Sequence, residues 1–454
     1  MPEQSIADRF MVDEIDFRSC FTAPSVKHFL SLLTGWVLTV GRHTLSAVIM
    51  TMGLHESHHF ATIYRFLARG QWSADHVSYR VFSLLAETFV SERADVTLVV
   101  DDTLNRHRGK KICGAAWQHD GAAPKRSKQF SHGVCFVIIG MAVRLPGIAD
   151  RTFCLPFAAR MWWPEGAKVR PQEAPRKTKP QLGLELIELT RAWIEDSHRV
   201  RVVGDIGYCC ETILKGRPKG VHLTGRVRMD SALYELPHRP AVRGRGRPRK
   251  KGPRMPTPAT MFLDPALTWS EIQVECYARQ CLLKTHLFKA IWYHAAGNEP
   301  LTFVLCHDPS GKHADAVFFD TDPEAGAADA IVRYASRFSI EITNRETKQL
   351  LGADDPQCRS ERSVLRAPLL AYWAYSLVVI WFVRHFSTAK SLVAQVAPWY
   401  NRKNVFTFSD MLAAARRSHF TIRFSPEAPS IKESHKKGAA RSTRQPEYTR
   451  SAKL

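Results

Sequence analysis

Three acidic positions in the sequence stand where carboxylates could act together. Asp102, or its neighbour Asp101, ends one apolar run, and Asp205 ends another. Glu341 lies in the amphipathic segment 334–348. Acids at the same end of adjacent parallel strands lie a few Å apart, which is unfavourable unless a divalent cation sits between them. Oxygen ligands suit Mg²⁺ or Mn²⁺, and two such ions about 3.5–4 Å apart support in-line displacement at a phosphodiester. The alternative for each Asp alone is that it only begins a turn.

A second pattern lies around Glu341, where four residues are separated by offsets of 0, 3, 7 and 14: Tyr334, Arg337, Glu341 and Lys348. At about 100° per residue these offsets map to about 0°, −60°, −20° and −40°, so the four side chains share one stripe of a helix. Glu346 points away from that stripe. The stripe is either a surface ladder of ion pairs or one wall of a site for a phosphate and a metal.

The first part of the chain is predicted to form a helical domain, residues 1–92, of a kind that often binds DNA. Apolar residues recur at spacings of 3–4 from residue 25 to residue 92. Breaks are expected near Gly41, Gly53 and Gly70, and Ser73 is a plausible N-cap for the last helix.

Residues 93–213 and 326–390 are predicted to form a mixed α/β core. The run DVTLVVDDT is typical of a strand buried on both faces that ends in its acids. Two further strands (HGVCFVIIGMAV and TFCLPFAARMWW), a helix (182–196) and a fourth strand (RVRVVGDIGY) follow. The crossover helix should place the fourth strand parallel to an earlier one.

The remaining regions have different patterns. Short strand signals from 214 to 325 predict a β-rich insertion, followed by helices at about 326–351 and 364–386. The apolar stretch 367–383 is predicted to be a buried core helix rather than a membrane span. The region 391–454 is basic, and from about residue 425 it is predicted to be disordered.

Composition indicates the kind of partner. The 454 residues contain 64 Lys and Arg against 43 Asp and Glu, a formal net charge of +21, which favours a polyanion such as nucleic acid. The ten cysteines contain no C-x-x-C pair, so reduced thiols are expected. Because no secretion signal is recognisable at the N-terminus, we expect a cytoplasmic location, in the bacterial cytosol or nucleoid, and no membrane partner.

Together the motifs resemble those of insertion-sequence DDE transposases with an RNase H-like core. The resemblance is carried by DDT (101–103), by D-x-x-Y in GDIGY, and by the spacing Y-x2-R-x3-E-x6-K, and it covers roughly residues 25–390. It implies an enzyme that cuts and joins the ends of an insertion sequence, acting on double-stranded DNA and forming a homodimer when bound to it. Under the resemblance, Asp102, Asp205 and Glu341 are catalytic and hold the metal ions, and Tyr334, Arg337 and Lys348 contact DNA phosphates. Asp102 is preferred over Asp101 because the family places its acid directly before the Thr.

Two other motifs suggest different sites. In the basic segment 242–254, Arg245 and Arg247 resemble the core of an AT-hook, which lays Arg side chains into the minor groove, although a solvated basic loop fits equally well. HESHH (55–59) has the H-E-x-x-H spacing of zinc hydrolases. The alternatives to an active transposase are therefore a catalytically inactive DNA-binding relative and, less favoured, a zinc hydrolase.

Overall fold

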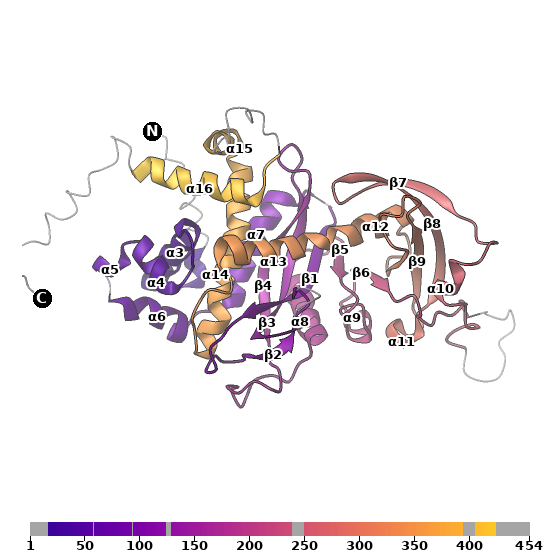
Figure 1. Ribbon diagram of the computed structural model, residues 1–454, viewed down its shortest axis with the longest axis horizontal. Helices are drawn as coiled ribbons and strands as arrows, with labels where there is room; N and C mark the ends of the chain where they lie inside the picture. The colour runs from indigo at the N-terminus through magenta and orange to yellow at the C-terminus, as the bar shows by residue number, and fades with distance from the viewer. Residues whose placement is uncertain are drawn as a thin grey trace, which may run out of the picture.

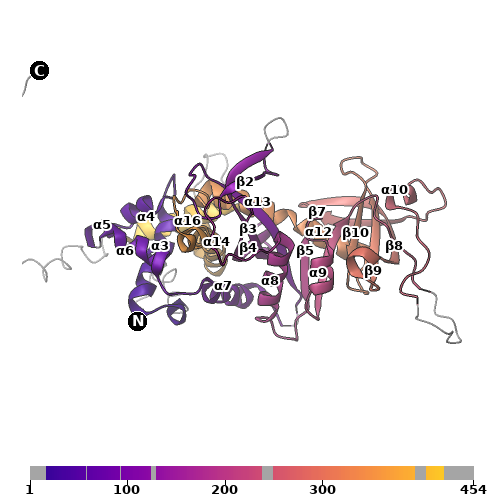
Figure 2. The same ribbon diagram turned by 90° about the horizontal axis from the view of Figure 1, so that it is seen from below.

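The structure is a computed structural model of the chain and describes residues 17–57, 59–92, 94–123, 129–237, 249–393 and 405–423. Figure 1 shows a sheet in the middle of the molecule with helices packed around it. The N-terminal helices lie at one end and strands β7, β8 and β9 at the other, and Figure 2 shows the same separation from below.

The core is one mixed sheet with the strand order β2-β3-β1-β5-β6-β10-β9-β8-β7, in which β4 also pairs with β3. In its centre β1 pairs antiparallel with β3 and parallel with β5, so the predicted parallel fourth strand is confirmed. The mixed α/β architecture expected from the sequence is thus confirmed. The strands are β1 (Val96–Arg106), β2 (Ala116–His119), β3 (Phe130–Arg144), β4 (Thr152–Trp162), β5 (Val200–Gly204), β6 (Val221–Val227), β7 (Ser270–Cys276), β8 (Arg279–Ile291), β9 (Pro300–His307) and β10 (Ala316–Asp320).

Strand β1 is longer than its apolar run suggests. It continues through the acids to Arg106, pairing with β3 as far as Gly133. Asp101 and Asp102 therefore lie in the middle of a strand, and the prediction that the strand ends at them is wrong. The reason is that the ladder to β3 satisfies the backbone on both sides of the acids.

The β-rich region after residue 214 extends the same sheet. β6 pairs parallel with β5, and β10, β9, β8 and β7 follow in antiparallel order. The predicted boundary near 214 falls between two strands that are hydrogen-bonded neighbours, so core and insertion share one continuous ladder. The short helices of this part are α9 (Glu211–Gly216), α10 (Pro258–Met261) and α11 (Tyr293–Ala296).

The N-terminal helical region has the breaks expected from the sequence. Ser73 caps α7 by accepting a hydrogen bond from the backbone N–H of His76, and Gly41 and Gly53 have positive φ between helices. A 3₁₀ turn (Arg18–Cys20) precedes the helices, which are α3 (Ala23–Leu38), α4 (Leu45–Thr51), α5 (Leu54–Ser57), α6 (Phe60–Arg69) and α7 (Ala74–Phe89).

A long apolar helix, α14 (Glu361–Arg384), joins these helices to the sheet. It contacts α3, α6, α7 and strand β4. It is long and apolar enough to cross a membrane, but 94% of its most apolar window is buried inside the protein, as predicted for a core helix. After α14 come α15 (Phe386–Ala389), a 3₁₀ turn (Lys390–Leu392) and α16 (Phe408–Arg423), which packs on α14. The disorder predicted from about residue 425 concerns residues outside those described.

The two faces of β1 are covered by different helices. α8 (Lys179–Arg191) approaches one face, where Gly183 lies against Val100. The other face is covered by α13 (Phe338–Leu351), as Figure 1 shows. Ile340 of this helix packs on Val99. The single helix expected over 326–351 is in fact two, α12 (Ala327–Ser336) and α13, which meet at Arg337.

A buried ion-pair cluster connects β5 to the far part of the sheet. Arg201 lies on β5, with its side chain 4% exposed, between Asp95 (3.0 Å) and Asp322 (2.5 Å). We expect Arg201→Met to lower the free energy of unfolding by roughly 3 kcal/mol, because it leaves buried carboxylate charge without its partner. Arg199→Met removes a cation that is 65% exposed near the same two acids, and it should cost less than about 1 kcal/mol. Urea unfolding measures both, and equal losses would contradict a buried cluster.

Candidate active site

The pairing of β1 with β5 brings two carboxylates together. The parallel register ends at Val100 opposite Gly204, so Asp101 and Asp205 are the next residues on the two strands. Burial raises the pKa of Asp101 to about 7, and the charge of Asp205 is the second cause. The sequence predicted two acids close together at the end of a parallel strand pair, and in the structure Asp101 is the acid beside Asp205.

Asp205 fits both roles that the sequence allows for it, a residue that begins a turn and a candidate metal ligand. One oxygen, Oδ1, accepts hydrogen bonds from the backbone N–H groups of Gly207 (2.9 Å) and Tyr208 (3.3 Å), so the residue does begin a turn. Within the described residues, its Oδ2 makes no hydrogen bond or ion pair. The turn therefore fixes the carboxylate while leaving one oxygen available.

Arg337 lies between Asp101 and the third acid, Glu341. Its Nη1 is 3.8 Å from Asp101 Oδ2, and its Nη2 donates to Glu341 Oε1 at 2.5 Å. Glu341 is 44% exposed, whereas Arg337 is 17% exposed. The Nε of Arg337 is buried and has no hydrogen-bond partner among the described residues. The guanidinium thus joins β1 to α13 and keeps one donor unused.

Asp102 points to the opposite face of the sheet. Its Oδ2 accepts from Lys179 Nζ of α8 at 2.6 Å, and its Oδ1 accepts from the hydroxyl of Tyr208 at 3.2 Å. The thiol of Cys135 lies 3.4 Å from Oδ2. The resemblance favours Asp102 over Asp101 as a metal ligand. In the structure Asp102 lies on the face away from α13, because successive side chains of a strand point to opposite faces.

Lys348 is hydrogen-bonded to β1. Its ammonium donates to Thr103 Oγ1 at 2.6 Å and to the carbonyl of Leu104 at 2.9 Å, and burial lowers its pKa. Two of its three N–H donors are therefore used inside the protein. The structure places Lys348 as an anchor of α13 on the sheet, which differs from the expected contact with a DNA phosphate.

Two tyrosines lie beside these residues. One is Tyr334, and the other is Tyr277, which the sequence did not indicate. Tyr334 lies on α12 with its ring 4.9 Å from that of Phe318, and it is partly buried. Tyr277 stands at the two-residue turn between β7 and β8, where it and Ala278 have positive φ (54° and 60°). Its ring is 50% exposed and meets Phe338 edge-on. No glycine or asparagine marks this turn in the sequence, so nothing there indicated a tight hairpin.

Two further motifs were singled out in the sequence. Arg245 and Arg247 lie outside the described residues. In HESHH, His55 belongs to α5, whereas His59 is the N-cap of α6 and accepts from the backbone N–H of Ala61. The motif therefore does not lie on one continuous helix, as the zinc-binding H-E-x-x-H requires. Within the described ranges no three His, Cys, Asp or Glu side chains are already clustered as a metal site.

Comparison with known proteins identifies the family. The model of a family described as DDE superfamily endonuclease matches residues 16–295, more than half of the chain. The chain belongs to this DDE superfamily. Its mixed sheet flanked by helices is consistent with an RNase H-like DDE fold. A search of curated proteins gave no match. The region matched in this DDE endonuclease contains Asp101, Asp102 and Asp205 but ends before α12, so the role of Glu341 depends on the geometry.

The residues fit the divalent metal that DDE endonucleases generally use. Asp101 and Asp205 offer adjacent carboxylates, and burial together with the charge of Asp205 raises the pKa of Asp101, so a divalent cation bound there would stabilise its charged form. Glu341 offers a third carboxylate, linked to Asp101 through Arg337, and it is 44% exposed. An oxygen-only donor set of this kind matches a hard divalent ion.

The raised pKa of Asp101 makes stability depend on pH. Between about pH 4 and pH 7 the folded state holds a proton on Asp101 that the unfolded state has lost, so stability falls as pH rises. In the metal-free protein, Asp101→Asn should therefore gain stability over wild type as pH rises through this window, by at most about 1.4 kcal/mol per pH unit, and no further above pH 7. Urea unfolding with chelator at pH 5, 6, 7 and 8 measures this.

Asp102→Asn is the matched control for that experiment. It removes the neighbouring carboxylate, which is paired with Lys179, but leaves the buried carboxyl of Asp101 in place, so most of the wild-type fall in stability should remain. The same pH-dependent gain in both variants would contradict the assignment of the buried, raised carboxyl to Asp101.

Proposed function

We propose that this DDE endonuclease is a DNA transposase that cuts the ends of its insertion sequence and joins the freed 3′-hydroxyl to target DNA. The observation that carries the proposal is the convergence of Asp101 and Asp205 at the parallel β1–β5 pair, on the face covered by the helix that holds Glu341. The net charge of +21 supports a DNA substrate.

In this proposal Asp101, Asp205 and Glu341 hold Mg²⁺ or Mn²⁺, as two ions. Bound there, such ions activate a water or a 3′-hydroxyl and stabilise the leaving oxygen of a phosphodiester. Asp101 replaces Asp102 as the strand ligand because it shares the face with Arg337 and Glu341. In this proposal Asp102, on the other face of β1, has a structural role, because its ion pair with Lys179 holds β1 against α8.

The surrounding side chains position the DNA. Among the described residues the Nε of Arg337 has no hydrogen-bond partner, and that donor suits an oxygen of the strand being cut. Lys348 fixes α13 on β1 and so sets where Glu341 and Arg337 stand. Tyr334 supports Arg337, whose guanidinium carbon lies 5.8 Å from its ring centre. Arg245 and Arg247, in the basic segment, are proposed as further DNA contacts.

The proposal extends to assembly and location. Two ends must be held together for transposition, so a homodimer on DNA is expected, in the bacterial cytosol.

The competing hypothesis is a relative that binds DNA without cutting it. Inverted repeats with a short direct duplication in the DNA flanking the gene would favour the transposase.

The strand carboxylates are tested by nicking of an end-sequence duplex with Mg²⁺. We expect Asp205→Ala and Asp101→Asn to lower the nicking rate by at least about a thousandfold while duplex binding persists, because each removes a metal ligand and not a phosphate contact. Asp102→Asn changes the adjacent acid on the other face and should retain most of the activity.

Each opposite outcome is informative in that assay. Loss of nicking in Asp102→Asn with full activity in Asp101→Asn would assign the ligand as the DDT motif suggests. Wild-type protein that binds the duplex and never nicks it, with either Mg²⁺ or Mn²⁺, would refute the transposase in favour of the binding protein.

The helical carboxylate is tested by comparing two glutamates on α13. Glu341→Gln should abolish nicking, because it removes the third ligand from the face of Arg337. Glu346 pairs instead with Arg151 at 2.8 Å and accepts from the hydroxyl of Tyr375, so Glu346→Gln should lower stability by about 1–3 kcal/mol and leave the rate per folded molecule near wild type. Equal rate losses, measured at matched folded fractions, would remove the argument from helical face.

A further inference from the structure

A second basic site lies at the opposite edge of the sheet from Asp205. There the structure has an open cavity of about 660 Å³ between the turn before β6 and the turn before β9. Because β5 and β6 are parallel, the amino end of β6 lies at the edge where β5 begins, whereas Asp205 follows the end of β5. Five residues of strand separate the two edges, or about 16 Å at ~3.3 Å per residue.

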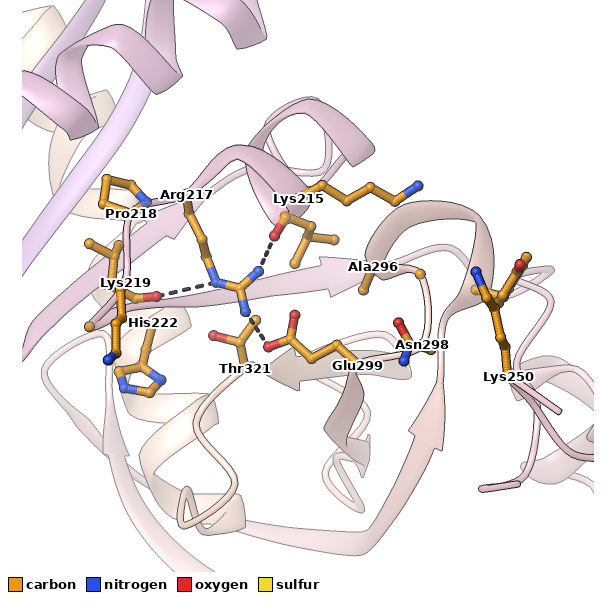
Figure 3. Close-up of a pocket in the computed structure, with 15 residues that line it drawn as sticks. Lys215, Arg217, Pro218, Lys219, His222, Lys250, Ala296, Asn298, Glu299 and Thr321 are labelled. Carbon is orange, nitrogen blue, oxygen red and sulfur yellow. Dashed lines mark hydrogen bonds and ion pairs between the residues drawn. The ribbon is translucent and has the colours of Figure 1, made fainter. Parts of the chain in front are cut away.

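The floor of this cavity is fixed by Arg217. Its guanidinium donates to the carbonyl oxygens of Leu214 and Val221 and pairs with Glu299, so its charge is neutralised within the protein. Figure 3 shows this pair in the middle of the lining residues. Glu299, the acid among the lining residues, is thus already paired, and the lining Lys215 pairs with Glu211, so neither acid neutralises Lys219 or Lys250.

Cations stand on both sides of the Arg217–Glu299 pair. Figure 3 shows the ammonium of Lys219 on one side, near the imidazole of His222, and that of Lys250 on the other. Within the described part of the chain, no carboxylate pairs with Lys219 or Lys250, and both are exposed. Lys250 also belongs to the basic segment 242–254 that the sequence singled out.

Neutral donors lie between these cations. Asn298 contributes an exposed amide to the lining. The Oγ1 of Thr321 accepts from the backbone N–H of Leu223, which leaves its hydroxyl hydrogen as a donor. Positive charge at two separated points, with neutral donors between, suits a chain of phosphodiesters better than one phosphate.

We propose that this cavity binds the phosphate backbone of a second DNA segment, distinct from the strand held at Asp205. The inference rests on the proposed DNA-cutting function and adds a second contact to it. One duplex with a phosphate at Asp205 would have to bend sharply round the sheet to reach the opposite edge, and DNA resists such bending over its ~50 nm persistence length.

The test measures capture of a second duplex by the full-length chain. The protein is saturated with an unlabelled end duplex in chelator, which prevents cutting, and a labelled second duplex is titrated by fluorescence anisotropy from 50 to 200 mM salt. Lys219→Ala/Lys250→Ala should weaken capture by at least about tenfold and flatten the slope of log K against log salt by about 1.8, since two phosphate contacts are lost.

A matched control removes two lysines of the same sheet outside the cavity. Lys284→Ala/Lys289→Ala, both on β8, should leave capture and its salt slope as in wild type. Mg²⁺-dependent nicking of a single end duplex should be unchanged in both double variants. An unchanged second-duplex affinity in the cavity variant, or an equal loss in the β8 variant, would overturn the inference.

Two further outcomes distinguish a DNA-binding cavity from a small-anion site and from the cutting activity itself. Competition by millimolar inorganic phosphate that abolishes capture would show a site for a small anion and would overturn a DNA-binding site. Because capture is measured without divalent ions, failure of the wild type to nick refutes the proposed function alone, whereas loss of capture in the cavity variant still supports the second contact.

Discussion

The burial of the Asp101 carboxyl beside Asp205 is the constraint on which the centre of this protein depends. The parallel β1–β5 ladder ends at Val100 and Gly204, so it sets the backbones of Asp101 and Asp205 beside each other. The protein offsets part of that cost with Arg337, which reaches Asp101 from the junction of α12 and α13. The positions of α13, of Glu341 and of the unused Arg337 Nε follow from where that guanidinium must stand.

The architecture could be predicted because its strands are apolar runs and its helices are bounded by glycines and capping residues. The parallel fourth strand and the cap at Ser73 could both be predicted from the residues. Which of the adjacent acids faces the helix could not. β1 is buried on both faces, so its apolar run has no alternation to indicate the direction of Asp101 or Asp102. Only the packing of Val99 on Ile340 decides it.

The stripe on α12 and α13 shows a second limit of reasoning from spacing. The period correctly separated Glu341 from Glu346, which pairs with Arg151 behind the helix. It could not show that Lys348 is buried against β1, since a lysine at that spacing looks the same in sequence whether it meets a carbonyl or a phosphate. The helix break at Arg337 was also invisible, because its backbone remains helical (φ −53°, ψ −37°) and no Gly or Pro marks it.

The uninterrupted ladder from β2 to β7 has a mechanical consequence. A separate module joined by linkers could swing, but strands that share hydrogen bonds with β5 cannot shift without breaking β5 from β6. The Arg201 cluster, which ties β5 to the loop after β10, stiffens the same junction. Any molecule bound by the distal strands is therefore held at a fixed distance and orientation from Asp101 and Asp205.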